Sequence, residues 1–143
     1  MHMTKPQDEI YWKNRSIEDQ KRDWNQLGKN WIEDYTLSVD HPHRIEIIKA
    51  LISVSPFESV LEIGCNAGPN LKKISYTFPQ VQITGIDINK EAIQEAQKHL
   101  PSAILEVGSA IQDYDFFDKS FGVTICDAVL MYVHRDEVLQ VFG

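Results

Sequence analysis

The sequence predicts an α/β fold built on a doubly wound parallel sheet with helices on both faces. Apolar runs typical of strands alternate with segments of helical periodicity, and the first strand is followed by a turn that contains glycine. Such alternation favours parallel strands joined by right-handed helical crossovers. Four strands can be assigned, and we expect the order 3-2-1-4, with a ligand over the strand ends where the first and fourth strands meet.

The first part of the chain, residues 1–39, is predicted to form a helical segment that caps a second unit, residues 40–143. Residues 1–15 are polar and are expected to be loose at the start. A helix is predicted from Ser16, its expected N-cap. Its apolar stripe contains Trp24, Leu27, Trp31 and Tyr35. A stripe of this kind usually packs on the core, although some of its rings could cap a ligand pocket.

A second helix is predicted after the sequence His41-Pro42-His43-Arg44, and Pro56 lies just beyond its end. The two histidines could be interpreted as a metal pair. No further ligands follow at a recognisable spacing, so capping or solvated histidines are favoured and no metal site is predicted.

The stretch 60–71 predicts a strand, a tight turn and the start of a helix. Residues 60–63 include three strong strand formers. Gly64 and Gly68 permit backbone angles that side chains disfavour, and Asn66 tolerates positive φ better than most residues. A turn of this kind at a helix N-terminus is a typical place to bind a nucleotide-like ligand.

Helices and strands continue to alternate after this turn. Proline residues end two predicted helices, and Asn89 is a suitable N-cap for the second of them. The later predicted strands are residues 81–87, 103–107 and 122–130, and a last helix is predicted to begin at Arg135. Asp87 ends the second strand about 20 residues after the turn, the usual spacing for an acid that binds ribose hydroxyls.

The composition excludes several functional classes. A formal net charge of −7 opposes general affinity for nucleic acid, which needs a basic patch. No apolar run approaches the length of a membrane span, and the N-terminus lacks the apolar core of a signal peptide. Cys65 and Cys126 then indicate a reducing compartment, and we expect a cytoplasmic protein, although a disulfide between them remains an alternative.

The turn resembles the first motif of class I S-adenosylmethionine-dependent methyltransferases, which is an acid and three glycines, each separated by one residue. Here the motif comprises Glu62, Gly64, Asn66 and Gly68, so Asn66 replaces the middle glycine. The resemblance covers roughly residues 40–142. It implies a Rossmann-like fold, truncated relative to the seven strands usual in that family.

The resemblance also implies a methyltransferase activity and a binding site for S-adenosylmethionine and its product S-adenosylhomocysteine. Glu62 would neutralise the cationic part of the methionine moiety, N–H groups from Cys65 to Gly68 would bind its carboxylate, and Asp87 would bind the ribose. The loop after the third strand would contact the adenine, although an Asp often stands where this chain has Ser109. The other positions implied for the cofactor are Gly64, Asn66, Asn70, Ile88, Ser109, Ala110, Ile111 and Asp127.

No catalytic residue is assigned, because methyl transfer needs alignment more than a general base. His134 could be a base, but a solvent-facing histidine is the favoured interpretation. The acceptor is expected to be a small molecule. The apolar fourth strand would lie at a sheet edge, which predicts a homodimer through that strand or the helix after it.

Two alternatives remain. The chain could be a truncated piece, or a remnant that binds the cofactor without turnover. It could also be a nicotinamide-nucleotide-binding domain, but that class has glycines where this chain has Asn66 and Pro69.

Overall fold

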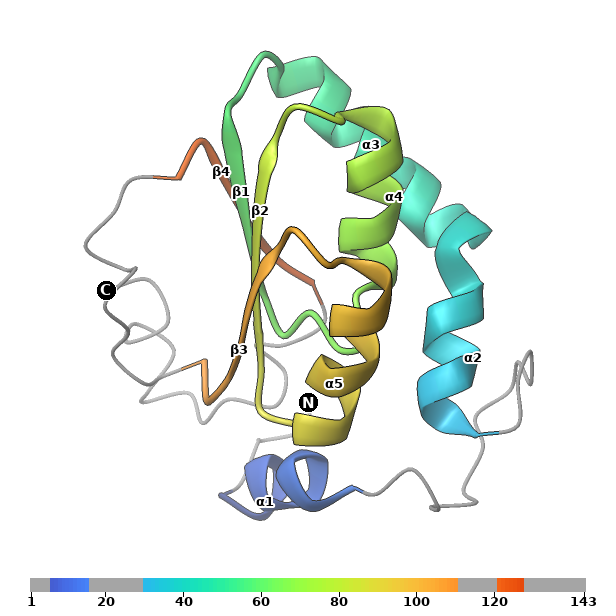
Figure 1. Ribbon diagram of the computed structural model, residues 1–143, viewed down its shortest axis with the longest axis vertical. Coiled ribbons are helices and arrows are strands. Elements are labelled where there is room, and N and C mark those ends of the chain that lie inside the picture. The colour runs from blue at the N-terminus through green and yellow to red at the C-terminus, as the bar shows by residue number, and fades with distance from the viewer. Residues whose placement is uncertain (1–5, 16–29, 111–120, 128–143) are drawn as a thin grey trace, which may run out of the picture.

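The computed structural model describes residues 6–15, 30–110 and 121–127. Its centre is a four-stranded parallel sheet with the order β3-β2-β1-β4 (Figure 1). The strands are β1 (Ser59–Ile63), β2 (Gln82–Asp87), β3 (Ile104–Val107) and β4 (Val123–Cys126). The predicted α/β class and strand order are therefore confirmed. Of the predicted fourth strand, residues 122–130, the segment Val123–Cys126 forms β4, and residues 128–130 lie outside the described residues.

The register brings three strand ends to one edge of the sheet. Ile63 at the end of β1 pairs with Ile86 on one side and with Cys126 on the other. Asp87 and Asp127 each follow one of these partners directly. Both acids therefore flank the point where the chain leaves β1 and enters the glycine turn.

The helix before β1 and the two helices that connect β1, β2 and β3 lie on one face of the sheet (Figure 1). They are α3 (Pro42–Val54), α4 (Pro69–Thr77) and α5 (Lys90–His99). The N-terminal elements are α1 (Pro6–Asn14), α2 (Trp31–Leu37) and a 3₁₀ helix η1 (Ser38–Asp40). Most of the connection between β3 and β4, residues 111–120, and the helix predicted to begin at Arg135 lie outside the described residues.

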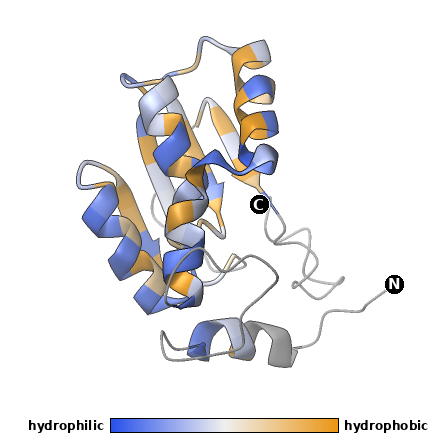
Figure 2. Ribbon diagram, turned by 90° about the vertical axis from the view of Figure 1, so that its right-hand side faces the viewer, coloured by the Kyte–Doolittle hydropathy of each residue, from blue (hydrophilic) through white to orange (hydrophobic). Residues whose placement is uncertain are grey.

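The core fills the space between the sheet and α3, α4 and α5. Figure 2 shows hydrophobic residues along the strands and a mixture of hydrophobic and hydrophilic positions on the helices. The buried apolar side chains of this core include Ile48, Leu51, Val60, Leu71, Ile74 and Ile93. Full burial of one such side chain stabilises the fold by about 1.5–3 kcal/mol, which fixes the helices on the sheet.

The N-terminal expectation was wrong in two respects. Residues 6–14 form α1 instead of a loose start. No single helix runs through to Tyr35, because Asn30 has an extended backbone and its side chain accepts the N–H of Glu33 at 3.0 Å. An N-cap of this kind starts a new helix at Trp31. Ser16, Trp24 and Leu27 lie outside the described residues.

Candidate cofactor site

The turn between β1 and α4 contains three residues with positive φ. They are Gly64 at 73°, Asn66 at 54° and Gly68 at 80°. Asn66 therefore adopts the left-handed conformation that the sequence predicted for it. A Cβ atom on Gly68 would lie 2.9 Å from Leu100 Cδ1 and 3.3 Å from Ala96 Cβ. Gly68 is thus required for packing against α5 as well as for the backbone conformation.

The N–H groups of this turn donate hydrogen bonds within the protein. Gly64 and Cys65 both donate to Ile86 O, at 2.8 and 2.9 Å. Asn66 N donates to Asp87 Oδ2 at 2.8 Å, Ala67 N to Asn66 Oδ1 at 2.7 Å, and Gly68 N to Cys65 O at 2.9 Å. The donors that were expected to bind a ligand carboxylate are therefore engaged within the turn and with β2.

Asp87 links the end of β2 to the turn. Its Oδ2 accepts from Asn66 N, and its Oδ1 accepts from Asn89 N, both at 2.8 Å. Burial raises the pKa of this carboxyl, while the two N–H donors act in the opposite direction. The side chain is only partly buried, and each oxygen retains acceptor capacity. Asp87 can therefore accept further hydrogen bonds from a ligand's hydroxyl groups.

Glu62 is a buried acid beneath the turn, with a relative exposure of 1%. Its Oε2 accepts from Asn70 Nδ2 at 2.6 Å, whereas its Oε1 has no hydrogen-bond partner among the described residues. Burial raises the pKa of Glu62 to about 8. An unpaired buried carboxyl oxygen is costly, so this position is suited to a cationic or donor-rich ligand group.

Asn70 connects Glu62 to a partly buried arginine on α3. Arg44 Nη1 donates to Asn70 Oδ1 at 2.8 Å, while its Nη2 and Nε donate to Ser38 Oγ and Ser38 O at 2.6 and 2.8 Å. Burial lowers the pKa of Arg44, opposed by the charge of Glu62. The guanidinium thus compensates part of the negative charge at this end of the sheet.

Asp127 accepts hydrogen bonds from α3 and α4. His43 Nε2 lies 2.9 Å from both carboxylate oxygens, and Asn70 Nδ2 lies 3.4 Å from Oδ2. The capping role predicted for the histidines is confirmed for His41, which accepts the N–H of His43 at 3.2 Å. The side chain of His43 instead binds Asp127. The roles of His43 and Arg44 could not be predicted from local sequence. Asp127, the partner of His43, lies 84 residues away along the chain, and Asn70, the partner of Arg44, lies 26 residues away.

The loop after β3 also reaches Asp87. Gly108 N donates to Asp87 O at 2.8 Å, which places the partly exposed Ser109 and Ala110 next in the chain. Ile88, directly after Asp87, is also partly exposed. Ile111, the last position expected near an adenine, lies outside the described residues.

Both cysteines are free thiols. Burial raises the pKa of Cys65 and of Cys126. Among the described residues, no group of three or more His, Cys, Asp or Glu side chains could hold a metal ion. Within the same part of the chain, no helix has the length and apolarity that crossing a membrane requires.

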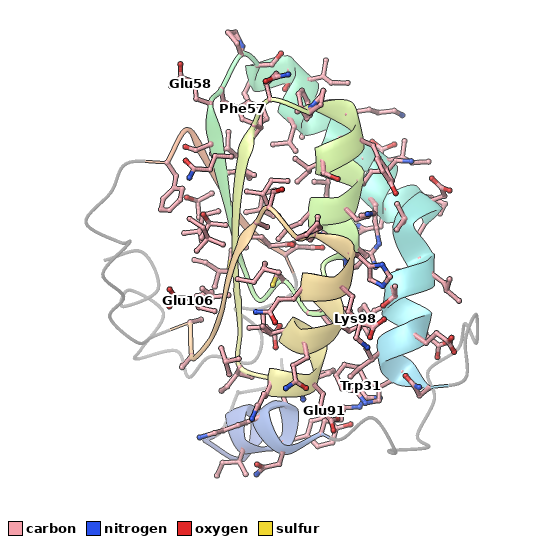
Figure 3. All side chains as sticks on the ribbon, viewed as in Figure 1. Trp31, Phe57, Glu58, Glu91, Lys98 and Glu106 are labelled. Atoms are coloured by element: carbon pink, nitrogen blue, oxygen red, sulfur yellow. The ribbon has the colours of Figure 1, made fainter. Side chains whose placement is uncertain are left out.

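The N-terminal helix is attached beside this site through Asn89. Asn89 Nδ2 donates to Trp12 O at 2.8 Å and to Arg15 O at 2.7 Å, while Oδ1 caps α5 by accepting Ala92 N at 2.9 Å. The Arg15 guanidinium lies 4.5 Å from the ring centroid of Trp31, a cation–π geometry. Figure 3 shows Trp31 at the end of the molecule where α1 meets α2 and α5.

The sequence profile of a family described as methyltransferase domain matches residues 60–143, more than half of the chain. The chain belongs to this methyltransferase family. The match begins in β1 and includes the glycine turn, Asp87 and Asp127.

Named relatives carry different methyltransferase activities. The demethylmenaquinone methyltransferase of Thermotoga maritima is 26% identical over 106 residues, which cover 73% of this chain and 45% of the relative. The O-methyltransferase ResE of Aspergillus sclerotiorum is 32% identical over 107 residues, covering 71% and 39%. The chain also matches two uncharacterized proteins of Rickettsia prowazekii, and it spans 22% of the length of one and 48% of the length of the other.

Solved structures show the same fold. The plantazolicin methyltransferase BpumL, in complex with a substrate analogue and SAH, aligns with a TM-score of 0.61 at 23% identity, over 78% of this chain and 45% of that one. The magnesium protoporphyrin IX methyltransferase of Synechocystis PCC 6803 with bound SAM has a TM-score of 0.66 at 14% identity, over 94% and 68%. At these identities the likeness establishes the fold.

Proposed function

We propose that this chain binds S-adenosylmethionine and forms the cofactor-binding part of a methyltransferase. The observation that carries the proposal is the pair of acids on either side of the glycine turn. Glu62 offers a buried carboxyl oxygen that has no partner in the described part of the chain, and Asp87 offers a partly exposed carboxylate that the turn itself holds in place. Family membership and the structures that contain SAM or SAH support the same cofactor.

Each part of the cofactor has a proposed partner. Asp87 would accept two ribose hydroxyls, and Glu62 would face the cationic part of the methionine moiety. The wall behind the methionine moiety would be formed by the turn residues Gly64, Cys65, Asn66 and Gly68. The adenine would lie against Ile88, Ser109, Ala110 and Ile111. Asn70 and Asp127 would border the methionine end, where they bind Glu62 and His43.

The methionine carboxylate needs donors other than the N–H groups of the turn, since these are engaged. Arg44 is the proposed partner. Its hydrogen bonds to Ser38 and Asn70 use three of its five N–H groups, so within the described part of the chain donors remain for an anion. Its positive charge is partly buried, and an anion beside it would offset the cost of that burial.

The cofactor, when bound, supplies a methyl group on a positively charged sulfur. The residues described here align it and exclude water, which provides much of what an in-line transfer requires. A small-molecule acceptor is proposed, in line with the substrate analogue bound to BpumL. The net charge of −7 gives no support to a nucleic-acid acceptor.

Three further properties of the chain are proposed: a division into two parts, a cytoplasmic location and a homodimer. Residues 1–39 are proposed to cap a binding unit formed by residues 40–143, supported by the attachment of Trp12 and Arg15 to Asn89. A cytoplasmic location is supported by the two free thiols. A homodimer through the region of β4 is proposed because β4 lies at one edge of the described sheet. Light scattering after size exclusion would detect such a dimer.

Equilibrium dialysis with radiolabelled S-adenosylmethionine tests the cofactor assignment. We expect saturable binding of one cofactor per chain, and a large loss for Asp87→Ala. The matched control is Glu106→Gln, since Glu106 is an exposed acid on the neighbouring strand (Figure 3). Absence of binding by a folded chain would contradict the proposal. Binding without transfer to any acceptor would instead favour the alternative of a cofactor-binding remnant.

A further inference from the structure

We propose that His43 and Asp127 form an acid–base pair that removes the proton from a hydroxyl group of the methyl acceptor. The inference rests on the proposed function and assigns to it a catalytic residue and a class of substrate. It starts from the bond between these two side chains, which neither the sequence motif nor the family match assigns.

The pair stands at the strand ends where the cofactor is proposed to bind. His43 is in the first turn of α3, and Asp127 directly follows β4. The last residue of β4, Cys126, pairs with Ile63, which immediately precedes Gly64 of the turn. Asp127 therefore lies beside the start of the cofactor turn, on the opposite side of β1 from the ribose acid Asp87. The adenosine and the His43–Asp127 pair would thus occupy different sides of the sulfur.

The geometry determines which nitrogen of His43 can act. A carboxylate only accepts hydrogen bonds, so Nε2, at 2.9 Å from both oxygens of Asp127, carries the proton that is donated. In the neutral imidazole, Nδ1 then holds the lone pair. The side chain of His43 is 56% exposed and that of Asp127 is 25% exposed, so a ligand can approach the ring while the acid stays largely covered.

The surroundings hold Asp127 and balance its charge. Asn70 Nδ2 approaches Asp127 Oδ2 at 3.4 Å from α4. The charged groups that interact with this end of the sheet are Arg44 on α3, Glu62 on β1 and Asp87 on β2. Asp127 therefore presents a carboxylate directly against the ring of His43, where it can hold the imidazole in place.

The same charges select the acceptor. A carboxylate acceptor needs no base and would be repelled by the carboxylates of Asp87 and Asp127. A hydroxyl is neutral until its proton leaves. In the proposed step the acceptor oxygen bonds to the methyl carbon, the carbon–sulfur bond breaks with its electron pair passing to sulfur, and the hydroxyl proton passes to Nδ1 of His43. The imidazolium is stabilised by Asp127 and returns the proton to solvent.

The test is a histidine NMR titration of the ¹⁵N-labelled chain, saturated in turn with S-adenosylmethionine and S-adenosylhomocysteine. His43→Gln assigns the His43 signals by their loss. We expect a proton on Nε2 and none on Nδ1 in the neutral ring. Because the sulfonium disfavours a second nearby cation, the midpoint of the His43 titration should be at least half a pH unit lower with S-adenosylmethionine than with the neutral product.

Equal midpoints in the two complexes would show that His43 does not face the reacting centre. A proton on Nδ1 would show that the lone pair points to Asp127. Either result overturns the proposal while leaving cofactor binding intact. The His43→Gln chain should bind S-adenosylhomocysteine within about threefold of the unaltered chain; a complete loss would instead assign His43 to cofactor binding. Failure of both cofactors to bind the unaltered chain would contradict the proposed function itself.

Discussion

The carboxylate of Asp87 accepts the backbone N–H of Asn66 at 2.8 Å, so the acid at the end of β2 holds the turn that follows β1. The bond explains how a non-glycine residue is kept at a φ of 54° in the middle of the turn. The side chain proposed to bind the ribose therefore also holds the conformation of the turn.

Asp87→Ala is expected to weaken binding of S-adenosylhomocysteine by roughly 10- to 100-fold, because hydrogen bonds to a charged acceptor contribute about 1.5–3 kcal/mol. The variant should also lower the free energy of unfolding, since the N–H groups of Asn66 and Asn89 lose their acceptor. Dialysis and urea denaturation measure the two effects. Unchanged affinity in a folded Asp87→Ala chain would refute the ribose role.

Gly68→Ala is expected to destabilise the protein by about 1–3 kcal/mol, because alanine disfavours a φ of 80° and its methyl group would meet Leu100 at 2.9 Å. Combining it with Leu100→Ala separates the two causes. The double variant should be less destabilised than the sum of the single variants, since the collision is gone while the backbone strain remains. Strict additivity in denaturation experiments would show that Leu100 does not limit residue 68.

Glu62 should make stability depend on pH. Its folded-state pKa of about 8 exceeds the ordinary value of 4.5, so the folded chain holds a proton that the unfolded chain releases. The contribution of Glu62 to stability is therefore lost as pH rises from 4.5 to 8. Relative to Glu62→Gln, the free energy of unfolding of the unliganded wild-type chain should fall by up to about 1.4 kcal/mol per pH unit in this window. Parallel pH profiles of the two proteins would disprove the raised pKa.

Asn89 has two functions that substitutions can separate. Asn89→Asp keeps an oxygen to cap α5 but loses the amide donor to Trp12 O and Arg15 O. It should release α1, with a change in tryptophan fluorescence, at little cost to α5. Asn89→Ala loses both functions and should cost about 1 kcal/mol more. If the fluorescence of the Asp variant is unchanged, other contacts hold α1.

Local sequence signals predicted the framework of the site. The strand formers before Gly64, the tolerance of Asn66 for positive φ and the position of Asp87 each depend on a few neighbouring residues or on a fixed spacing. For these reasons the strand order, the conformation of the turn and the position of Asp87 beside it could be predicted from the sequence.

The partners of the hydrogen-bond donors in the site could not be predicted from local sequence signals. The N–H groups of the turn were expected to bind a ligand, but Ile86 O and Asp87 accept three of them across the sheet. His43 and Arg44 find their partners only when α3 packs against α4 and the end of β4. The start of α2 at Trp31 was missed because the capping bond of Asn30 interrupted an otherwise continuous apolar stripe.

Isothermal titration calorimetry with S-adenosylmethionine and with NAD tests the central claim most directly, because both ligands carry an adenosine that Asp87 could bind. The unpaired oxygen of Glu62 favours the cationic cofactor and opposes a pyrophosphate. We predict one S-adenosylmethionine per chain and NAD binding at least about tenfold weaker, a difference of about 1.4 kcal/mol. Tighter binding of NAD than of S-adenosylmethionine would contradict the assignment.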